Sequence, residues 1–446
     1  MKNIFKTSVF ITITLITLAS CKKEEQLNAN LDVIDKNIIT KTSVDNWLDE
    51  NFLNPYNIET KFRFDRYELD LGKNITPPIE DQVIPAMEMV RDVWIRPFEA
   101  VGGSTFIKRI SPKQFILAGS AEFNVDGTIT LGTAEGGRKI VLYVINDFDK
   151  TNLASVKQMI QVIQHEYTHI LNQTVDYQTD YQTISRGGYA ANWTQETLAS
   201  GRALGFITQY ARSAPGEDFA EMSSNMLMLG RVVSNSIINN APGEGSVRLK
   251  KKEQMVVDYF KSAFNIDFYA LQTEVQNALN KISAPVLSRM IGPNIGYTSL
   301  YAAPATIATQ SAEFRGLWAQ AANSMRLNGF TLRDFRMTFK ANSVMTLTYS
   351  FSAGTTVYTA DADYYYEIAP DGTLALYLDD QPAGVAYENM DFINELMVPV
   401  NSYFQDNQFK PDWFDKTPGK IGIPGSLGGF YKSTDATSYF YGTLGS

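Results

Sequence analysis

Apolar residues recur at helical spacing through much of the first half of the chain. The longest such stretch spans residues 156–171, where the apolar side chains fall on one face of a helix. Shorter stretches around it repeat the same spacing. We therefore predict a largely helical first half, with helices at residues 156–171, 193–210, 217–229, 255–264 and 268–279.

Two more helices are expected earlier in the chain. Residues 42–46 offer helix-starting side chains before the apolar positions Trp47 and Phe52. Pro85 suits the first turn of a helix, and Pro97 would end it, because proline lacks the N–H that a helix interior requires.

Between these helices, residues 114–148 change to a β pattern. Three β-rich runs, 115–118, 128–131 and 139–145, are separated by turns that contain glycine. Asp126-Gly127 is a hairpin signal, and residues 133–137 are expected to form a turn or bulge. A strand just before the helix at 156–171 could bind an extended peptide by strand addition, or could be an ordinary sheet edge.

The last third of the chain has a different texture. Periodicity is lost near residues 283–296, where two prolines occur, and one helical piece follows around 314–321. Strand-like runs then fill 343–378, and the tail is rich in aromatic residues and glycine. We predict an α+β protein with a helical domain at 42–290 and an antiparallel β domain at 291–446.

The candidate chemistry lies inside the long helix, at His165-Glu166-Tyr167-Thr168-His169. These are the only two histidines of the chain. At positions i and i+4 they share one face of a helix, so both imidazoles can bind one Zn²⁺. The glutamate after the first histidine then lies where it can deprotonate a water at the metal.

The third ligand must be a carboxylate, because the chain has no other histidine and its one cysteine is Cys21. Glu217 and Glu221 are four residues apart at the start of a predicted helix, so one could bind metal while the other supports a ligating histidine. Spacing alone does not decide between them. The downstream candidates are Asp176, Asp180, Glu196, Glu217, Asp218 and Glu221.

Charge narrows the possible partners. The formal net charge is −9, so nucleic acid is not an expected partner. A short basic run at 248–252 is expected to be a solvated helix face.

The N-terminus resembles a bacterial lipoprotein signal. Two lysines and a short apolar run precede Leu18-Ala19-Ser20-Cys21, which is similar to a lipobox. The resemblance implies removal of residues 1–20, lipid on Cys21 and a linker over 21–41, with anchoring at the outer membrane, facing the periplasm or the cell surface. The alternative is an ordinary secretory signal. With one cysteine, no intrachain disulfide can form.

The motifs together resemble a known family. His-Glu-Tyr-Thr-His, then Tyr210, then Glu-Asp-Phe-Ala-Glu at 217–221, resemble the lethal-factor-like gluzincin metallopeptidases. More closely, residues 45–230 look like zinc-binding metallohydrolase lipoproteins found beside TonB-dependent nutrient importers. The resemblance implies a zincin-like fold in which His165, His169 and Glu217 bind zinc. It also implies that Glu166 is the general base, that Tyr210 donates to the oxyanion, and that Glu221 supports one of the zinc ligands.

We interpret the sequence as a lipid-anchored zinc metallohydrolase, most simply a peptidase acting on peptides or proteins. One alternative is a surface lipoprotein that binds nutrients and keeps a structural or vestigial zinc site. Another is hydrolysis of a non-peptide amide. A structural zinc site would need no general base, so Glu166 favours the enzyme.

Overall fold

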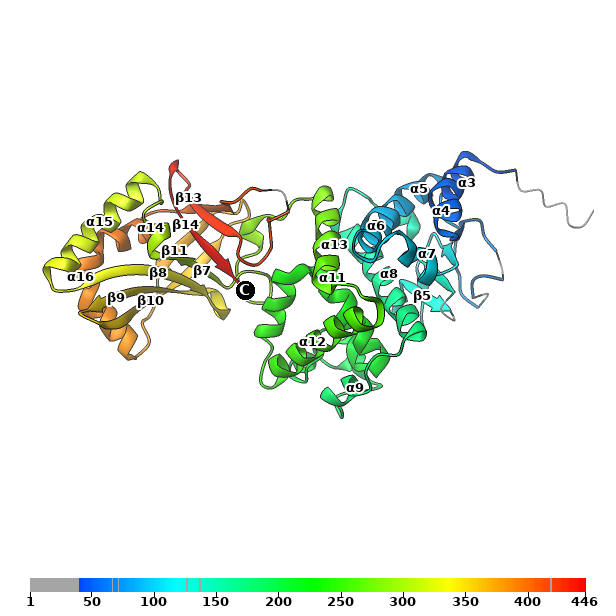
Figure 1. Cartoon of the computed structure of the whole chain (residues 1–446), viewed down its shortest axis with the longest axis horizontal. Coiled ribbons are helices and arrows are strands. Elements are labelled where there is room, and N and C mark those ends of the chain that lie inside the picture. Colours follow the sequence, from blue (N-terminus) through cyan, green and yellow to red (C-terminus); the bar gives the residue numbers. More distant parts are fainter. Residues whose placement is uncertain (1–39, 66, 71, 126, 136–137, 418) are drawn as a thin grey trace, which may run out of the picture. The chain divides into compact units, whose positions relative to one another are not determined.

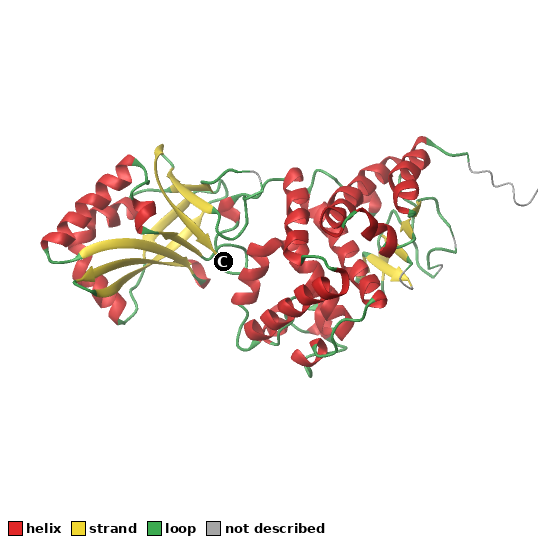
Figure 2. Cartoon of the chain, in the orientation of Figure 1, coloured by secondary structure: helices red, strands yellow, loops and turns green. Residues whose placement is uncertain are grey.

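The structure is a computed structural model that describes residues 40–446, except 66, 71, 126, 136–137 and 418. The predicted signal peptide, Cys21 and nearly all of the linker lie outside the described residues. Within the described part, no helix has the length and apolar character needed to cross a membrane. Figure 1 labels the elements, and Figure 2 shows helices dominating the first region and strands gathered in the last.

The first helices form as predicted, but the prolines do not lie where expected. Pro85 lies inside a helix that begins at Glu80, and Pro97 is the second residue of the segment Arg96–Gly102 instead of the end of a helix. A wider π turn precedes Pro97, so the ring sits in a first turn, where its missing N–H costs no hydrogen bond. These elements are α3 (Ser43–Leu48), η1 (Asp49–Leu53), α4 (Asn54–Tyr56), α5 (Glu80–Met89), η2 (Val90–Ile95), α6 (Arg96–Gly102) and α7 (Ser104–Ile110).

A small mixed sheet follows, in the order β1-β2-β6-β5. β1, β2 and β6 are parallel, whereas β5 is an antiparallel edge strand. Of the predicted run 128–131, only Ile129–Thr130 is strand, and the turn expected from residue 133 is strand up to Glu135. β3 and β4 form a hairpin around Gly127. The bounds are β1 (Glu59–Lys61), β2 (Gln114–Leu117), β3 (Glu122–Phe123), β4 (Ile129–Thr130), β5 (Gly132–Glu135), β6 (Lys139–Leu142) and η3 (Ile145–Asp147).

The helices that carry the His-Glu-Tyr-Thr-His motif and the candidate carboxylates come next, and one prediction among them is wrong. Residues 193–210 do not form one helix, because Thr197 caps a short helix that ends at Ala203, and Gly205 has a positive φ of 87°. The other predicted helices are present. The elements are α8 (Leu153–Thr174), α9 (Tyr181–Ile184), η4 (Trp193–Gln195), α10 (Leu198–Ala203), η5 (Tyr210–Arg212), α11 (Pro215–Asn239), α12 (Gly245–Phe264) and α13 (Phe268–Ile282).

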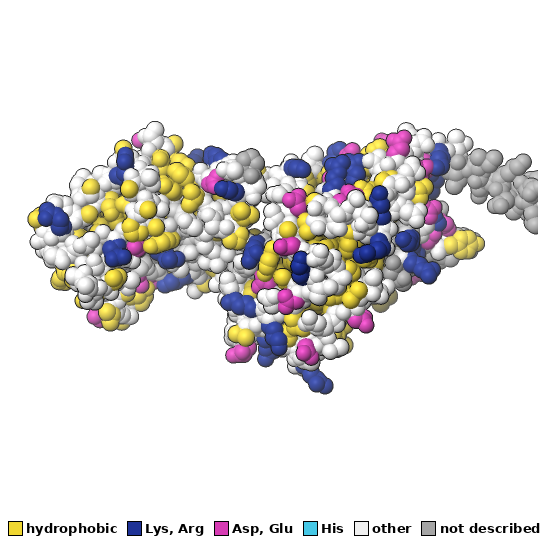
Figure 3. Space-filling model, viewed as in Figure 1, with side chains coloured by type: hydrophobic (Ala, Val, Ile, Leu, Met, Phe, Trp, Pro, Cys, Tyr) yellow, Lys and Arg dark blue, Asp and Glu magenta, His cyan; other side chains and the backbone are white. Residues whose placement is uncertain are grey.

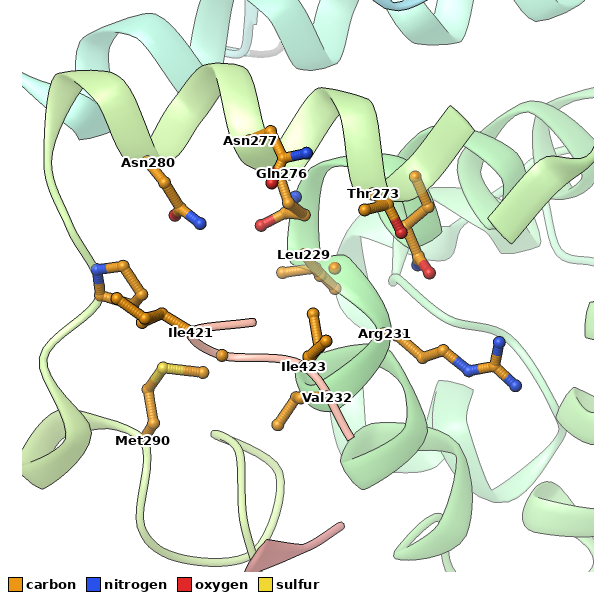
Figure 4. A pocket seen from close by; sticks show the side chains of 14 residues that line it. Leu229, Arg231, Val232, Thr273, Gln276, Asn277, Asn280, Met290, Ile421 and Ile423 are labelled. Carbon is orange, nitrogen blue, oxygen red and sulfur yellow. The ribbon is translucent and has the colours of Figure 1, made fainter. Parts of the chain in front are cut away.

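α11 is bent at Gly230, whose φ and ψ of 77° and 167° suit only glycine. The bend frees carbonyl groups, and α13 satisfies them: Gln272 Nε2 donates to Met226 O at 2.5 Å and Gln276 Nε2 donates to Leu227 O at 2.8 Å. A cavity lies at this bend, between Leu229 and Val232 of α11, Gln276 of α13, and Ile421 and Ile423 (Figure 4).

The C-terminal strands form a closed antiparallel barrel in the order β10-β11-β12-β13-β14-β7-β8-β9. The 21-residue helix α16 has no counterpart among the predicted elements. It packs on α15 and β10, and its apolar face joins the barrel core. The elements are η6 (Leu287–Arg289), β7 (Ser299–Ala302), α14 (Pro304–Ile307), α15 (Ala312–Leu327), β8 (Thr331–Phe339), η7 (Ala341–Ser343), β9 (Val344–Ala353), β10 (Thr356–Ile368), β11 (Leu374–Leu378), α16 (Val385–Gln405), β12 (Phe409–Trp413), β13 (Leu427–Lys432) and β14 (Asp435–Gly445).

The predicted α+β class is confirmed: helices and a mixed sheet come first, and an antiparallel β barrel comes last. The exact boundary near residue 290 stays a prediction. On the face drawn in Figure 3, basic and acidic side chains are interspersed.

Candidate metal centre

α8 places both histidines on one face, one turn apart. Its first turn is capped by the Asn152 side chain, which accepts from the N–H groups of Ala154 and Ser155. Its buried apolar stripe packs into the core and fixes the rotation of the helix. His165 is buried and His169 half-buried, and their rings meet edge to face with centroids 4.9 Å apart.

The first turns of α11 bring carboxylates to these imidazoles. Glu217 Oε2 lies 3.0 Å from His165 Nε2 and 3.4 Å from His169 Nε2, and the two Nε2 atoms are 3.2 Å apart. Tetrahedral ligands at zinc bond lengths of about 2.0–2.1 Å lie about 3.3 Å from one another. The spacing of the three atoms therefore fits one tetrahedral metal ion. Among the described residues, these three form the one group with metal-ligand spacing.

Glu221 lies behind the first histidine. Its Oε1 is 2.8 Å from His165 Nδ1, which fixes the ring with Nε2 facing Glu217 and His169. Burial lowers the pKa of His165, but hydrogen bonds to Glu217 and Glu221 outweigh it and raise that pKa to about 10. The surroundings of His165 thus favour positive charge, which suits a cation. Glu217 therefore shares metal-ligand spacing with the two histidines, whereas Glu221 contacts the other ring nitrogen of His165.

Glu166 lies beside the ligands and faces the edge strand. Its pKa is raised by burial and lowered in part by both histidines and by a hydrogen bond from the Ala134 backbone in β5. The same strand packs closely on α8 nearby, because a Cβ on Gly132 would overlap Val162. β5 and α8 therefore run side by side past Glu166.

Tyr210 lies in the short η5 turn and not at the end of a long helix. Its ring is 6.0 Å from that of His165 and 5.1 Å from that of Trp193. Burial, followed by the Glu217 carboxylate, raises the pKa of its hydroxyl, so the hydroxyl stays a proton donor. With 39% of its surface exposed, Tyr210 can be reached by a substrate.

The remaining carboxylate candidates lie outside the ligand set. Glu196 pairs with Arg212 at 2.9 Å. Asp218 is fully buried and accepts from Lys252 Nζ at 2.7 Å and from Tyr189 at 2.9 Å. Burial raises the pKa of Asp218 and lowers that of Lys252. The basic run at 248–252 is therefore not wholly solvated as predicted, because its last lysine is buried in an ion pair that anchors the residue next to Glu217.

Sequence reasoning also missed Thr208, whose hydroxyl donates to Glu221 Oε2 at 2.6 Å. A lone threonine in a loop gives no signal of such a role. For Lys252 the sequence carried a weak signal, because its spacing from Leu249 and Val256 places it on the buried face of α12.

Comparison with known proteins agrees with this site. A family model described as "Putative zinc-binding metallo-peptidase" matches residues 37–269, just over half of the chain. The chain belongs to this family. Zn²⁺ is its cofactor, and the two histidines and Glu217 fit the ion.

One solved structure is also similar, a crystal structure described as a putative zinc-binding metallo-peptidase from Bacteroides caccae. It is 34% identical, and the match covers 55% of this chain and 97% of the other, with a TM-score of 0.48. No curated protein matches the chain.

Proposed function

We propose that this metallopeptidase is of the gluzincin type and that Glu166 is its general base. The observation that carries the proposal is the cluster of His165, His169 and Glu217, with ligand atoms 3.0–3.4 Å apart, and Glu166 directly beside it. A purely structural zinc site would be closed by four protein ligands and would need no free carboxylate.

Each residue then has a distinct task in hydrolysis. When bound, Zn²⁺ polarises the scissile carbonyl and makes water a better nucleophile. Glu166 removes the proton from the attacking water and delivers it to the nitrogen of the leaving amine. Its buried position, which raises its pKa, suits a group that must both accept and return a proton.

Tyr210 is proposed to stabilise the charge that develops on the carbonyl oxygen. Its hydroxyl is protonated and lies beside Glu217, so it can donate to an oxyanion formed at the same point. Its packing on Trp193 limits its freedom to move, which favours a preorganised donor.

The edge strand β5 is the proposed peptide-binding element. A substrate could add to it as an extended strand, because β5 ends the sheet. A cavity of about 100 Å³ lies beside Leu131 and the part of α8 from Ser155 to Val162. Along the helix this lining is about 6–16 Å from Glu166, which matches about two to five residues of an extended peptide. The cavity can therefore hold a side chain at least two residues from the cleaved bond.

The location is proposed on the sequence alone. The lipobox-like sequence that ends at Cys21 supports a lipid anchor in the outer membrane. The family resemblance supports a location beside TonB-dependent importers. Peptide or protein fragments are the proposed substrates there.

Glu166→Gln tests the mechanism, because the variant keeps the shape of the side chain but not its basicity. We expect bound zinc to be unchanged and cleavage of a peptide library to fall by about 10²–10⁴-fold. A chelator should abolish cleavage, and added zinc should restore it. Equal behaviour of zinc-loaded wild type and variant on peptides would reject the proposal. Saturable binding of peptides without cleavage would then favour the nutrient-binding alternative.

A further inference from the structure

The loop that carries Tyr210 is tied to α11 by one hydroxyl group. Thr208 Oγ1 donates to Glu221 Oε2 at 2.6 Å, and it accepts from the backbone N–H of Ala211 at 3.2 Å. Ala211 follows Tyr210 directly in the η5 turn. The side chain of Thr208 thus joins a carboxylate of the metal site to the turn that presents the tyrosine.

The carboxylate of Glu221 is used at both oxygens. Oε1 accepts from His165 Nδ1 at 2.8 Å, and Oε2 accepts from Thr208 and, at 3.3 Å, from Asn225 Nδ2. A continuous path of hydrogen bonds therefore runs from the zinc-binding imidazole through Glu221 and Thr208 to the Tyr210 turn. Two elements that are far apart in the sequence depend on one side chain for their relative position.

We propose that Thr208 is a positioning residue that aligns His165, through Glu221, with Tyr210. The role of the Tyr210 end rests on the proposed function, whereas the role of the His165 end rests only on metal binding. Thr208 holds the Glu221 carboxylate in one orientation, so that Glu221 Oε1 stays on His165 Nδ1 and the ring keeps Nε2 toward the metal position. The accepted bond from Ala211 fixes the turn at the same point.

A role of Thr208 confined to its own turn would have different consequences. A threonine hydroxyl that accepts a backbone N–H three residues on is a common turn feature. That feature explains the bond from Ala211 but not the shorter bond to Glu221. The two roles separate in what they change: a turn feature affects folding stability alone, whereas a positioning residue also affects zinc affinity and catalytic rate.

The decisive variants are Thr208→Val and Thr208→Ser. Valine keeps the shape and loses the hydroxyl, whereas serine keeps the hydroxyl. For Thr208→Val we expect zinc affinity, measured by competition with a chromogenic chelator on metal-free protein, to fall about 10-fold, within the range seen when the partner of a ligand is removed. On peptides, kcat should fall with little change in KM. Thr208→Ser should restore both. Thr174→Val is the matched control, because Thr174 Oγ1 donates to Ile170 O within α8 and, among the described residues, has no hydrogen bond to the metal site.

A double-mutant cycle with Tyr210→Phe tests the second half of the path. If Thr208 works by holding Tyr210, the loss in kcat of the double variant should be smaller than the two single-variant losses combined. Zinc affinity should fall in Thr208→Val and stay unchanged in Tyr210→Phe. Unchanged zinc affinity in Thr208→Val, failure of serine to restore it, or full additivity would overturn the proposal. If the wild type cleaves no peptide but the zinc effect is present, the proposed function fails and the link to His165 stands.

Discussion

The helical region around α8 and α11 and the C-terminal barrel bury different kinds of side chain. In the helical region, charged and polar groups are buried in connected sets, such as Asp218 with Lys252 and Tyr189. The barrel core is mainly aromatic and aliphatic, with Phe314 and Phe440 in ring contact. The barrel also buries polar sets, such as Asp363 with Thr346 and Tyr387, but among its described residues no ion pair has both partners buried as Asp218 and Lys252 are.

The difference indicates where function constrains the chain. Buried charges are costly, so they persist where they hold a chemical group in place. Aromatic side chains in a core stabilise the fold by packing and offer no group for catalysis or metal binding. The matched family segment ends at residue 269, before the barrel begins. Metal-ligand spacing among the described residues occurs only in the helical region. We therefore expect variants in the buried network around Asp218 and Glu221 to change zinc binding, and variants in the barrel to change stability alone.

Breaking the buried ion pair should give the largest effect. Lys252→Met leaves Asp218 buried without its partner, and we expect a loss of about 3–5 kcal/mol in the free energy of unfolding. Because Asp218 adjoins Glu217, zinc affinity should fall as well. Chemical denaturation and chelator competition measure the two effects.

Lys251→Met is the control for that experiment, since Lys251 is exposed on the same helix. It should change neither quantity noticeably. A Lys252→Met protein that is destabilised but binds zinc normally would contradict the idea that buried charge in this region supports the site.

A cavity in the barrel should be nearly as costly but without effect on the metal. Met397 is fully buried on α16, so Met397→Ala should lower the free energy of unfolding by about 2–5 kcal/mol. Val398→Ala, at an exposed neighbour, should be close to neutral. Zinc affinity measured below the unfolding transition should equal that of the wild type. A weakened zinc site would break the contrast between the two regions.

The bend of α11 gives a smaller effect of purely backbone origin. Gly230→Ala forces a side chain into a conformation that suits only glycine and against Gln276, so we expect a loss of about 1–3 kcal/mol. Gly316→Ala is the opposite control, because Gly316 lies in α15 with open space around it. Alanine there should stabilise the protein by up to about 1 kcal/mol. Thermal unfolding of both variants provides the comparison.

The sequence predicts the helical region better than the barrel, for physical reasons. Two histidines at helical spacing on a long amphipathic stretch leave little freedom, and α8 forms around them as expected. Residues 193–210 fail because glycine and capping signals interrupt the apolar spacing. α16 was missed, although its apolar positions follow helical spacing, because aromatic and β-branched residues flank it on both sides.

The site was predictable only where residue type restricts chemistry. Histidine scarcity required a carboxylate ligand, but the choice between Glu217 and Glu221 depends on the direction in which α11 approaches α8. Thr208 and Lys252 act through contacts that link distant segments, and a single sequence carries no record of such contacts.

The smallest expected effect comes from a polar cluster that does not belong to the site. Glu68 accepts from Lys61 at 2.5 Å and pairs with Lys139 at 3.3 Å, and the Lys61 bond, followed by the Lys139 bond, lowers its pKa from 4.5 against the effect of burial. Because the folded-state pKa is depressed, the cluster stabilises the protein above about pH 4.5, and this contribution is lost as the pH falls through the folded-state pKa. Lys61 is one-third exposed, so solvent screening limits the cost of Glu68→Gln to about 1 kcal/mol at pH 7. The difference from wild type should shrink as the pH falls below 4.5, while zinc affinity at pH 7 stays unchanged. A weakened zinc site in this variant would mean that polar clusters in the first region are coupled to the metal more widely than the buried network around Glu221 and Asp218.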